Sequence, residues 1–412
     1  MKLLSAIKLF RQKDLSVLLA ANIISTVGDF LTSLALPIYL YAAKSDPLVL
    51  AISYIAYYLP KFPVQLFAGV YVDKKNSCKI FVWGNFLSFL FTMGYVYIIG
   101  TGSMALLYLN VFIVSSINTF VGISSSTMLT KMTDKKEYPL ALNVFTMVYS
   151  IAAMLIPPLG TVVLLKWGVK PMFFGDAISF LVAGVLVMGT ISSQKFSSDL
   201  PEGSGNPFDG LWTEIRQGYL LVLDKSIIKM AFLLLFFGGL VGRFLDVLTV
   251  FILQDKFRLG MELGNFMGIR GVGSLAGSLL ILQFLGKDMF KSFVKIHFFA
   301  IASLLFFVLP SNLLLAYFGM FAFGFFTIGI SLAVRNILNA NSERSDMGKM
   351  FSLFRVVVTL SSIIPLLIVD GMRRVLGSAS NALLAAVLVC LVIDACLFVF
   401  SGRYETKVAE EV

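Results

Sequence analysis

Val27-Gly28-Asp29-Phe30-Leu31 lies near the middle of an apolar run from Leu15 to Ala42, and this run decides how the chain is interpreted. The run is longer than the roughly 20 residues that a helix needs to cross a bilayer. A carboxylate at the centre of such a helix costs about 2.5–3.5 kcal/mol, so Asp29 requires a partner or a water-filled cavity. The stretch therefore predicts a membrane helix that carries a paired or functional acid at midspan.

A near-copy of these five residues occurs in the second half of the chain. Val241-Gly242-Arg243-Phe244-Leu245 lies midway along an apolar run from Lys229 to Leu253, with arginine in place of aspartate. Weaker parallels between residues 133–136 and 342–345 indicate that the two halves run in the same direction. The repeat predicts a duplicated protein whose halves meet at a polar site near the membrane midplane.

The composition is that of a polytopic membrane protein. Of 412 residues, 58% are hydrophobic and 14% are charged, and the mean hydropathy is +0.89. These values exclude an ordinary soluble globule. The formal net charge of +10 is assigned to loops by the positive-inside rule, not to nucleic-acid binding. The 3 cysteines indicate neither a disulfide framework nor a metal motif.

Apolar runs predict twelve spans, at residues 15–42, 48–71, 80–99, 104–130, 139–165, 171–191, 229–253, 263–286, 292–309, 313–336, 348–371 and 380–401. An even number places both termini on one side of the membrane. That side carries 23 of the 33 lysines and arginines, so we expect both termini to be cytoplasmic. The expected location is the cytoplasmic (inner) membrane.

The one long connection divides the chain. Residues 192–228 begin with a polar, turn-forming stretch and continue with apolar residues at helical spacing, which predicts a cytoplasmic linker with an amphipathic helix. The expected domains are an N-terminal six-helix bundle at 1–191, this linker at 192–228, and a C-terminal six-helix bundle at 229–412. The predicted fold is an all-α membrane protein with twelve transmembrane helices in two pseudo-symmetric bundles.

Short motifs at several of these spans carry a family resemblance. They are Gly28-Asp29 followed by Ala35-Leu36-Pro37, Leu59-Pro60, Gly69 to Lys74, Pro157-Pro158-Leu159-Gly160, and Gly348 to Leu353. With these motifs the chain resembles the major facilitator superfamily over nearly its whole length, and in particular the branch of drug and siderophore exporters that includes macrolide-efflux and enterobactin-exporter proteins. The resemblance implies alternating access, in which the two bundles rock around a cargo cavity.

The resemblance also implies a cytoplasmic gate. In the family, the motif between the second and third spans latches the outward-facing state. Here that role falls to Gly69, Asp73 and Lys74, with Lys349 or Arg355 as the partner of Asp73.

Two departures from the family pattern concern this gate and the coupling of transport to protons. The family's small residue and two basic residues are replaced by Asn76, Ser77 and Cys78, and Gln283 stands where the second-half copy would carry its acid. The family's helix-4 arginine is also missing, because Asn118, Thr119 and Gly122 occupy that stretch. We therefore expect a one-sided gate and do not transfer proton coupling through a helix-4 arginine.

Five ionisable residues within the spans are the candidate proton-coupling or cargo-binding residues: Asp29, Lys61, Arg243, Asp246 and Arg270. Such residues usually face a bundle interior or a cavity. We interpret Asp29 as a cavity carboxylate whose protonation accompanies cargo movement, and the alternative is a structural ion pair with Arg243 or Lys61. Arg243 and Asp246, at i and i+3 on one helix, either neutralise each other or contribute to binding an anionic cargo.

The other two cations lie beside helix-breaking or small residues. Pro60 and Pro63 flank Lys61 and predict a kink where the ammonium reaches a cavity, with snorkelling to the interface as the alternative. Arg270 lies in a glycine-rich run that lets another helix approach closely. It contacts either the cargo or a structural partner.

Three further polar groups receive structural interpretations. Asp176 and Asp394 are interpreted as structural or interfacial. His297 is the only histidine. With no acid or thiol close to it in sequence, we interpret it as an interfacial residue and not as a proton relay or metal ligand.

These observations favour a secondary transporter that exports a small or medium organic molecule, siderophore-like or drug-like, by proton antiport. The mixed signs of the charges favour an anionic or zwitterionic cargo. The alternatives are uptake of a siderophore, flipping of a lysolipid, and a transport-dead sensor or partner on this scaffold. An enzyme is not expected, because the sequence contains no HExxH or Gly-x-Ser-x-Gly motif.

The expected partners are the cargo, protons and the lipid bilayer. We expect no cofactor, no metal site and no nucleic-acid partner, and a monomeric protein.

Overall fold

A computed structural model describes residues 12–133, 138–196, 226–258, 263–281, 289–341 and 347–410 of the chain. Within these ranges the regular elements are helices and no strand occurs. The chain forms two compact units. Unit 1 comprises Met1–Leu40 and Ile52–Asp209, and unit 2 comprises Tyr41–Ala51 and Gly210–Val412. The predicted all-α class is confirmed.

Unit 1 is built from long apolar helices joined by short connections. The elements are α2 (Lys13–Ala43), α3 (Pro47–Tyr58), α4 (Lys61–Lys74), α5 (Ser77–Thr101), α6 (Met104–Met132), α7 (Tyr138–Trp167), α8 (Lys170–Thr190) and the 3₁₀ turn η1 (Ser193–Phe196). The break between α3 and α4 lies at Leu59 and Pro60, which confirms the predicted kink in the second span.

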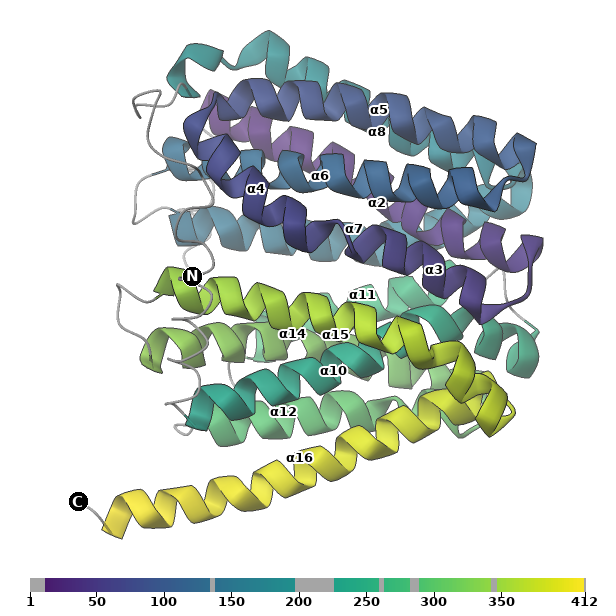
Figure 1. Ribbon diagram of the computed structural model, residues 1–412, viewed down its shortest axis with the longest axis vertical. Coiled ribbons are helices and arrows are strands. Elements are labelled where there is room, and N and C mark those ends of the chain that lie inside the picture. Colours follow the sequence, from purple (N-terminus) through teal and green to yellow (C-terminus); the bar gives the residue numbers. More distant parts are fainter. Residues whose placement is uncertain are drawn as a thin grey trace. The chain divides into compact units, whose positions relative to one another are not determined.

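Capping residues fix the ends of these helices. Asn76 begins α5, because its side-chain oxygen accepts a hydrogen bond from the Lys79 amide at 3.0 Å. At the other end Gly102 adopts φ +68°, a left-handed conformation that suits glycine. The helix packs against both α6 and α8 (Figure 1). The core of unit 1 lies among α2, α5, α6 and α8 and includes Leu15, Leu18, Phe81, Met128 and Val187.

Unit 2 repeats the plan of long antiparallel helices. Its elements are α10 (Ser226–Ile252), the π turn η2 (Leu253–Phe257), α11 (Leu263–Leu280), α12 (Met289–Ser303), α13 (Leu305–Val308), α14 (Leu313–Asn341), α15 (Met347–Leu376) and α16 (Ala379–Glu410). One core cluster of this unit joins α10, α12 and α14 through Ile228, Leu234, Phe293, Val334 and Ile337. The long helix α16 packs on α10 and α12 (Figure 1).

Glycines bring α11 and α14 into backbone contact. A Cβ atom at Gly273 would collide with the Phe321 carbonyl, and one at Gly324 would collide with the Arg270 carbonyl. Close approach through small residues is a common way for membrane helices to pack. The predicted close approach at the glycine-rich run is therefore confirmed, and it fixes the backbone that carries Arg270.

Within the described ranges, 11 helical stretches are long and apolar enough to cross a membrane. The remaining predicted span, 263–286, corresponds to α11, whose glycines and Arg270 lower its hydropathy; residues 282–286 lie outside the described ranges. The chain is thus a multi-pass membrane protein. The predicted linker helix lies outside the described residues, and the domain boundaries 1–191, 192–228 and 229–412 stay predictions.

Candidate functional site

Asp29 lies on α2 at a point of close contact with α8. The residue before it, Gly28, is buried, and a Cβ atom there would collide with Ser179 and Asp176. Only glycine permits α2 to lie this close to α8. Asp29 itself is exposed, whereas Asp176 is 2% exposed. The contact therefore places one buried and one accessible carboxylate near each other.

Asp176 is held from both of these helices. Its Oδ2 atom accepts a 2.5 Å hydrogen bond from the Thr32 hydroxyl, one turn beyond Asp29 on α2. The Ser179 hydroxyl donates to the Asp176 backbone carbonyl at 2.7 Å. Among the described residues, Asp176 Oδ1 is buried without a hydrogen-bond partner. Sequence reasoning assigned Asp176 a structural role and did not connect it with Asp29, because no pattern in either helix shows that these faces meet.

Lys61 contributes the positive charge of this cluster. Its ammonium lies 3.6 Å from the centre of the Tyr57 ring and 5.2 Å from that of Tyr58, which are cation–π distances. Asp29 interacts electrostatically with this ammonium and with the Asp176 carboxylate. We call Asp29, Asp176 and Lys61 the acidic cluster of unit 1. Its two carboxylates and one ammonium carry a formal charge of one negative unit when ionised.

An open pocket of about 250 Å³ lies between α2 and α7 and is lined by Asn22, Ile23, Thr26, Phe145, Val148 and Tyr149. Asn22, Thr26 and Asp29 recur at i, i+4 and i+7, so they share one face of α2. This periodicity was available in the sequence and indicates a polar face of α2. One turn beyond Thr26, the Phe30 ring packs against the ring of Tyr149, with 5.2 Å between the ring centroids.

The second charged cluster lies within unit 2, on α10 and α11. Asp246 Oδ2 pairs with Arg243 Nη1 at 2.7 Å, and Asp246 Oδ1 with Arg270 Nη1 at 3.2 Å. The Arg270 guanidinium also lies 5.2 Å from the centre of the Phe323 ring. All three charged side chains are partly buried, with exposed fractions of 20% to 32%. We call Arg243, Asp246 and Arg270 the basic cluster; it carries a formal charge of one positive unit.

The structure shows some of the interactions predicted for the candidate site residues. The pairing of Arg243 with Asp246 along one helix is present, and Arg270 joins it from the neighbouring helix. A role of these residues in cargo binding or proton coupling stays a prediction. The gate residues Gly69, Asp73 and Lys74 lie in α4, and Lys349 and Arg355 lie in α15. Their side chains fall outside the described part of the chain, so the gate also stays a prediction.

Where the resembling family carries a helix-4 arginine, α6 presents neutral polar groups. The Ser88 hydroxyl of α5 donates to the Asn118 side-chain oxygen at 2.7 Å, and the Thr119 hydroxyl donates to the Ser115 carbonyl at 2.8 Å. These groups are satisfied by neutral partners and carry no charge of their own.

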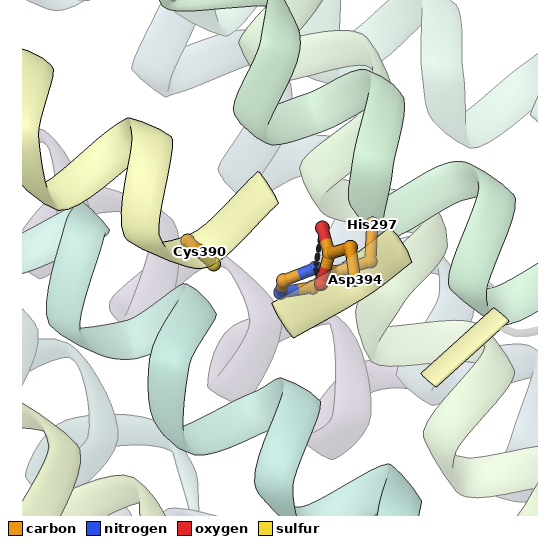
Figure 2. Close-up of side chains that lie close together, drawn as sticks. All are labelled: His297, Cys390 and Asp394. Atoms are coloured by element: carbon orange, nitrogen blue, oxygen red, sulfur yellow. Dashed lines mark hydrogen bonds and ion pairs between the residues drawn. The ribbon is translucent and has the colours of Figure 1, made fainter. Parts of the chain in front are cut away.

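The interpretation of His297 was wrong. The imidazole is completely buried, and its Nδ1 atom lies 2.9 Å from both carboxylate oxygens of Asp394, with Cys390 beside them (Figure 2). The residue therefore has both an acid and a thiol near it. They come from α16, 97 residues further along the chain in the case of Asp394, so local sequence did not reveal them.

Comparisons with known proteins agree with this architecture. The family model of the Major Facilitator Superfamily matches residues 18–365. No protein of curated function matches the sequence.

Solved structures of transporters share the fold over nearly the whole chain. A POT family transporter in complex with a thioalcohol-conjugated peptide has a TM-score of 0.74 at 13% identity, covering 94% of this chain and 96% of the other. A POT family transporter in complex with 5-aminolevulinic acid has a TM-score of 0.70 at 13% identity, with coverage of 94% and 96%. An inward-facing bacterial homologue of the iron transporter ferroportin has a TM-score of 0.69 at 16% identity, with coverage of 93% and 98%. At these identities the likeness shows the fold.

Proposed function

The chain belongs to the major facilitator superfamily, and from this premise we propose that it exports a small or medium organic molecule in exchange for protons by alternating access. The observation that carries the proposal is the environment of Asp29. Asp29 is an exposed residue in the middle of an apolar membrane helix, and it shares a helix face with Asn22 and Thr26, which line an open pocket. An ionisable group at that depth is costly, and a carboxylate accessible from a cavity can exchange protons there.

The acidic cluster supports a role for Asp29 as the proton carrier. Asp29 interacts with a positive charge on Lys61 and lies near a second acid, Asp176. Loading a proton on Asp29 removes the repulsion between the two acids, and releasing it restores the attraction to Lys61. In an antiporter, cargo and proton compete for such a site. We propose that the cationic group of the cargo and the proton alternate at Asp29.

The basic cluster supports the choice of a cargo that also carries a negative charge. Arg243 and Arg270 both pair with Asp246, so the cluster brings two guanidinium groups to one carboxylate. Guanidinium groups bind carboxylates and phosphates through paired hydrogen bonds. The basic cluster therefore favours a cargo that carries a carboxylate or a phosphate. The conjugated peptide and 5-aminolevulinic acid in the POT family structures are molecules of this size class.

The proposal is tested by flux into inside-out membrane vesicles acidified within, with 5-aminolevulinic acid, a dipeptide, erythromycin and enterobactin as probes. We expect the acid interior to drive accumulation of at least one probe. Asp29→Asn should abolish the dependence on the pH gradient, and Arg243→Ala should weaken uptake of probes that carry a negative group. Normal transport by both variants would remove these residues from the mechanism.

Two variants serve as matched controls. Asp46→Asn changes an exposed acid that caps α3, where its side-chain oxygen accepts a hydrogen bond from the Leu48 amide. Asparagine can accept the same hydrogen bond. Arg374→Ala removes an arginine that is 65% exposed near the end of α15. Both should transport normally. Accumulation in right-side-out vesicles instead would indicate uptake or lipid flipping, and probe binding without flux in either orientation would indicate a sensor.

A further inference from the structure

Three potential metal ligands meet inside unit 2. His297 projects from α12, and Cys390 and Asp394 project from the same face of α16 at i and i+4 (Figure 2). One donor atom from each of the three lies within 4.8 Å of the other two. The residues are 0%, 1% and 0% exposed, respectively. The cluster is thus separate from the pocket and from both charged clusters described above.

The imidazole is oriented toward the two α16 side chains. Nδ1 lies 2.9 Å from each oxygen of Asp394. On the other side of the ring, Nε2 packs against Gly238 of α10, where a Cβ atom would collide with it. Nε2 has no hydrogen-bond partner in the described part of the chain. Gly238 therefore allows the ring to sit with its only polar contact on the Nδ1 side. This is the orientation that presents Nδ1 as a ligand next to a carboxylate and a thiol.

The cluster can hold a divalent cation without net charge. One carboxylate, one thiolate and one neutral imidazole together carry two negative charges, which a divalent cation cancels. A site with a formal charge of zero is compatible with burial in a membrane protein, where a net charge is strongly unfavourable.

From this donor set we infer that His297, Cys390 and Asp394 form a binding site for a divalent transition metal of the zinc class. Zinc accepts this mixture of nitrogen, sulfur and oxygen ligands at about 2.0–2.3 Å, whereas calcium and magnesium prefer oxygen alone. A tetrahedral ion would separate its ligand atoms by roughly 3.3–3.7 Å. The carboxylate and the imidazole need to move apart slightly and the thiolate to move inward.

Such an ion would link α12 to α16. Because the three residues are fully buried, exchange with free metal requires opening of unit 2, and we expect a slowly exchanging structural ion instead of a transported one. The inference does not depend on the proposed transport function. Its test is therefore a direct measurement of metal on the purified protein.

The first experiment measures metal content by mass spectrometry after purification from zinc-replete cells, without chelators and with an affinity tag that lacks histidine. We expect about one zinc per chain in the wild type and at least a roughly tenfold lower content in Cys390→Ser and Asp394→Asn. Cys396→Ser is the matched control, because this exposed cysteine lies on the same helix outside the cluster. Equal metal content in wild type and Cys390→Ser would overturn the inference.

The second experiment identifies the ligands in the intact wild-type protein, so it does not depend on whether a variant folds. Protein produced in cobalt-supplemented, zinc-depleted medium should show near-ultraviolet thiolate-to-cobalt charge transfer together with the visible bands of tetrahedral cobalt. Cys396→Ser should retain both. Wild-type protein that is metal-free, or that binds cobalt without a thiolate band, would show that the cluster is only a hydrogen-bonded His297–Asp394 pair beside an inert thiol.

Discussion

The five-residue motif that occurs twice in the chain has different surroundings in the two units. In unit 1, Gly28 lies against α8, and Asp29 meets a second acid from that helix and a lysine from α4. In unit 2, a Cβ atom at Gly242 would meet none of the described residues within 4 Å, and Arg243 pairs with Asp246 on its own helix. The repeat has preserved a membrane helix with a midspan charge, but the contacts and the sign of that charge differ.

The two clusters also differ in how their charges are balanced. The acidic cluster contains a buried carboxylate oxygen that finds no hydrogen-bond partner among the described residues, and its two acids repel each other. The basic cluster has one carboxylate bridging two guanidinium groups, so loss of that acid would leave two like charges together. Removing an acid should therefore have opposite effects in the two units. The following predictions test this asymmetry, beginning with the largest effect.

Asp246→Ala should give the largest loss of stability. Breaking a buried ion pair costs about 3–5 kcal/mol, and the partial exposure of this cluster lowers the expected cost to about 2–3 kcal/mol. The measurement is the free energy of unfolding in mixed micelles, obtained by titration with dodecyl sulfate. Arg270→Ala is the matched comparison, because it leaves the Arg243–Asp246 pair in place and should cost about 1 kcal/mol or less. Equal losses in the two variants would contradict a shared acid.

Alanine at the two motif glycines should have opposite effects. At Gly28 the new methyl group collides with Ser179 and Asp176, and overpacking of this kind costs about 1–3 kcal/mol. At Gly242 the methyl group has space, so the higher helix propensity of alanine should stabilise the protein by up to about 1 kcal/mol. The same unfolding titration compares the two variants. Similar losses at both positions would mean that the two motif helices are packed alike.

The sequence was sufficient to predict the helices but not to predict which residues their polar side chains contact. An apolar run of about 20 residues is long enough to cross the bilayer, and a helix satisfies its backbone hydrogen bonds there. The spans and the charges at their centres could therefore be predicted. The pairing of Arg243 with Asp246 could also be predicted, because it lies within one helix.

The contacts of Asp176 and His297 could not be predicted, because they join helices far apart in the chain. Helical periodicity shows which residues share a face but not which faces meet. The i, i+4 spacing of Cys390 and Asp394 places both on one face of α16, but nothing in the sequence indicated a metal site there. Their proximity to His297 depends on the packing of α12 against α16.

The smallest expected effect concerns the acid of unit 1 that is buried. Asp176→Asn removes one of two repelling charges and keeps an oxygen that can accept a hydrogen bond from Thr32. The free energy of unfolding should therefore rise, by less than about 1 kcal/mol. Asp29→Asn should relieve the same repulsion. If the two acids interact, the double variant gains less than the sum of the single gains, because the repulsion can be removed only once. Additive gains in the unfolding titration would show that Asp29 and Asp176 act independently, and the acidic cluster would then consist only of Asp29 and Lys61.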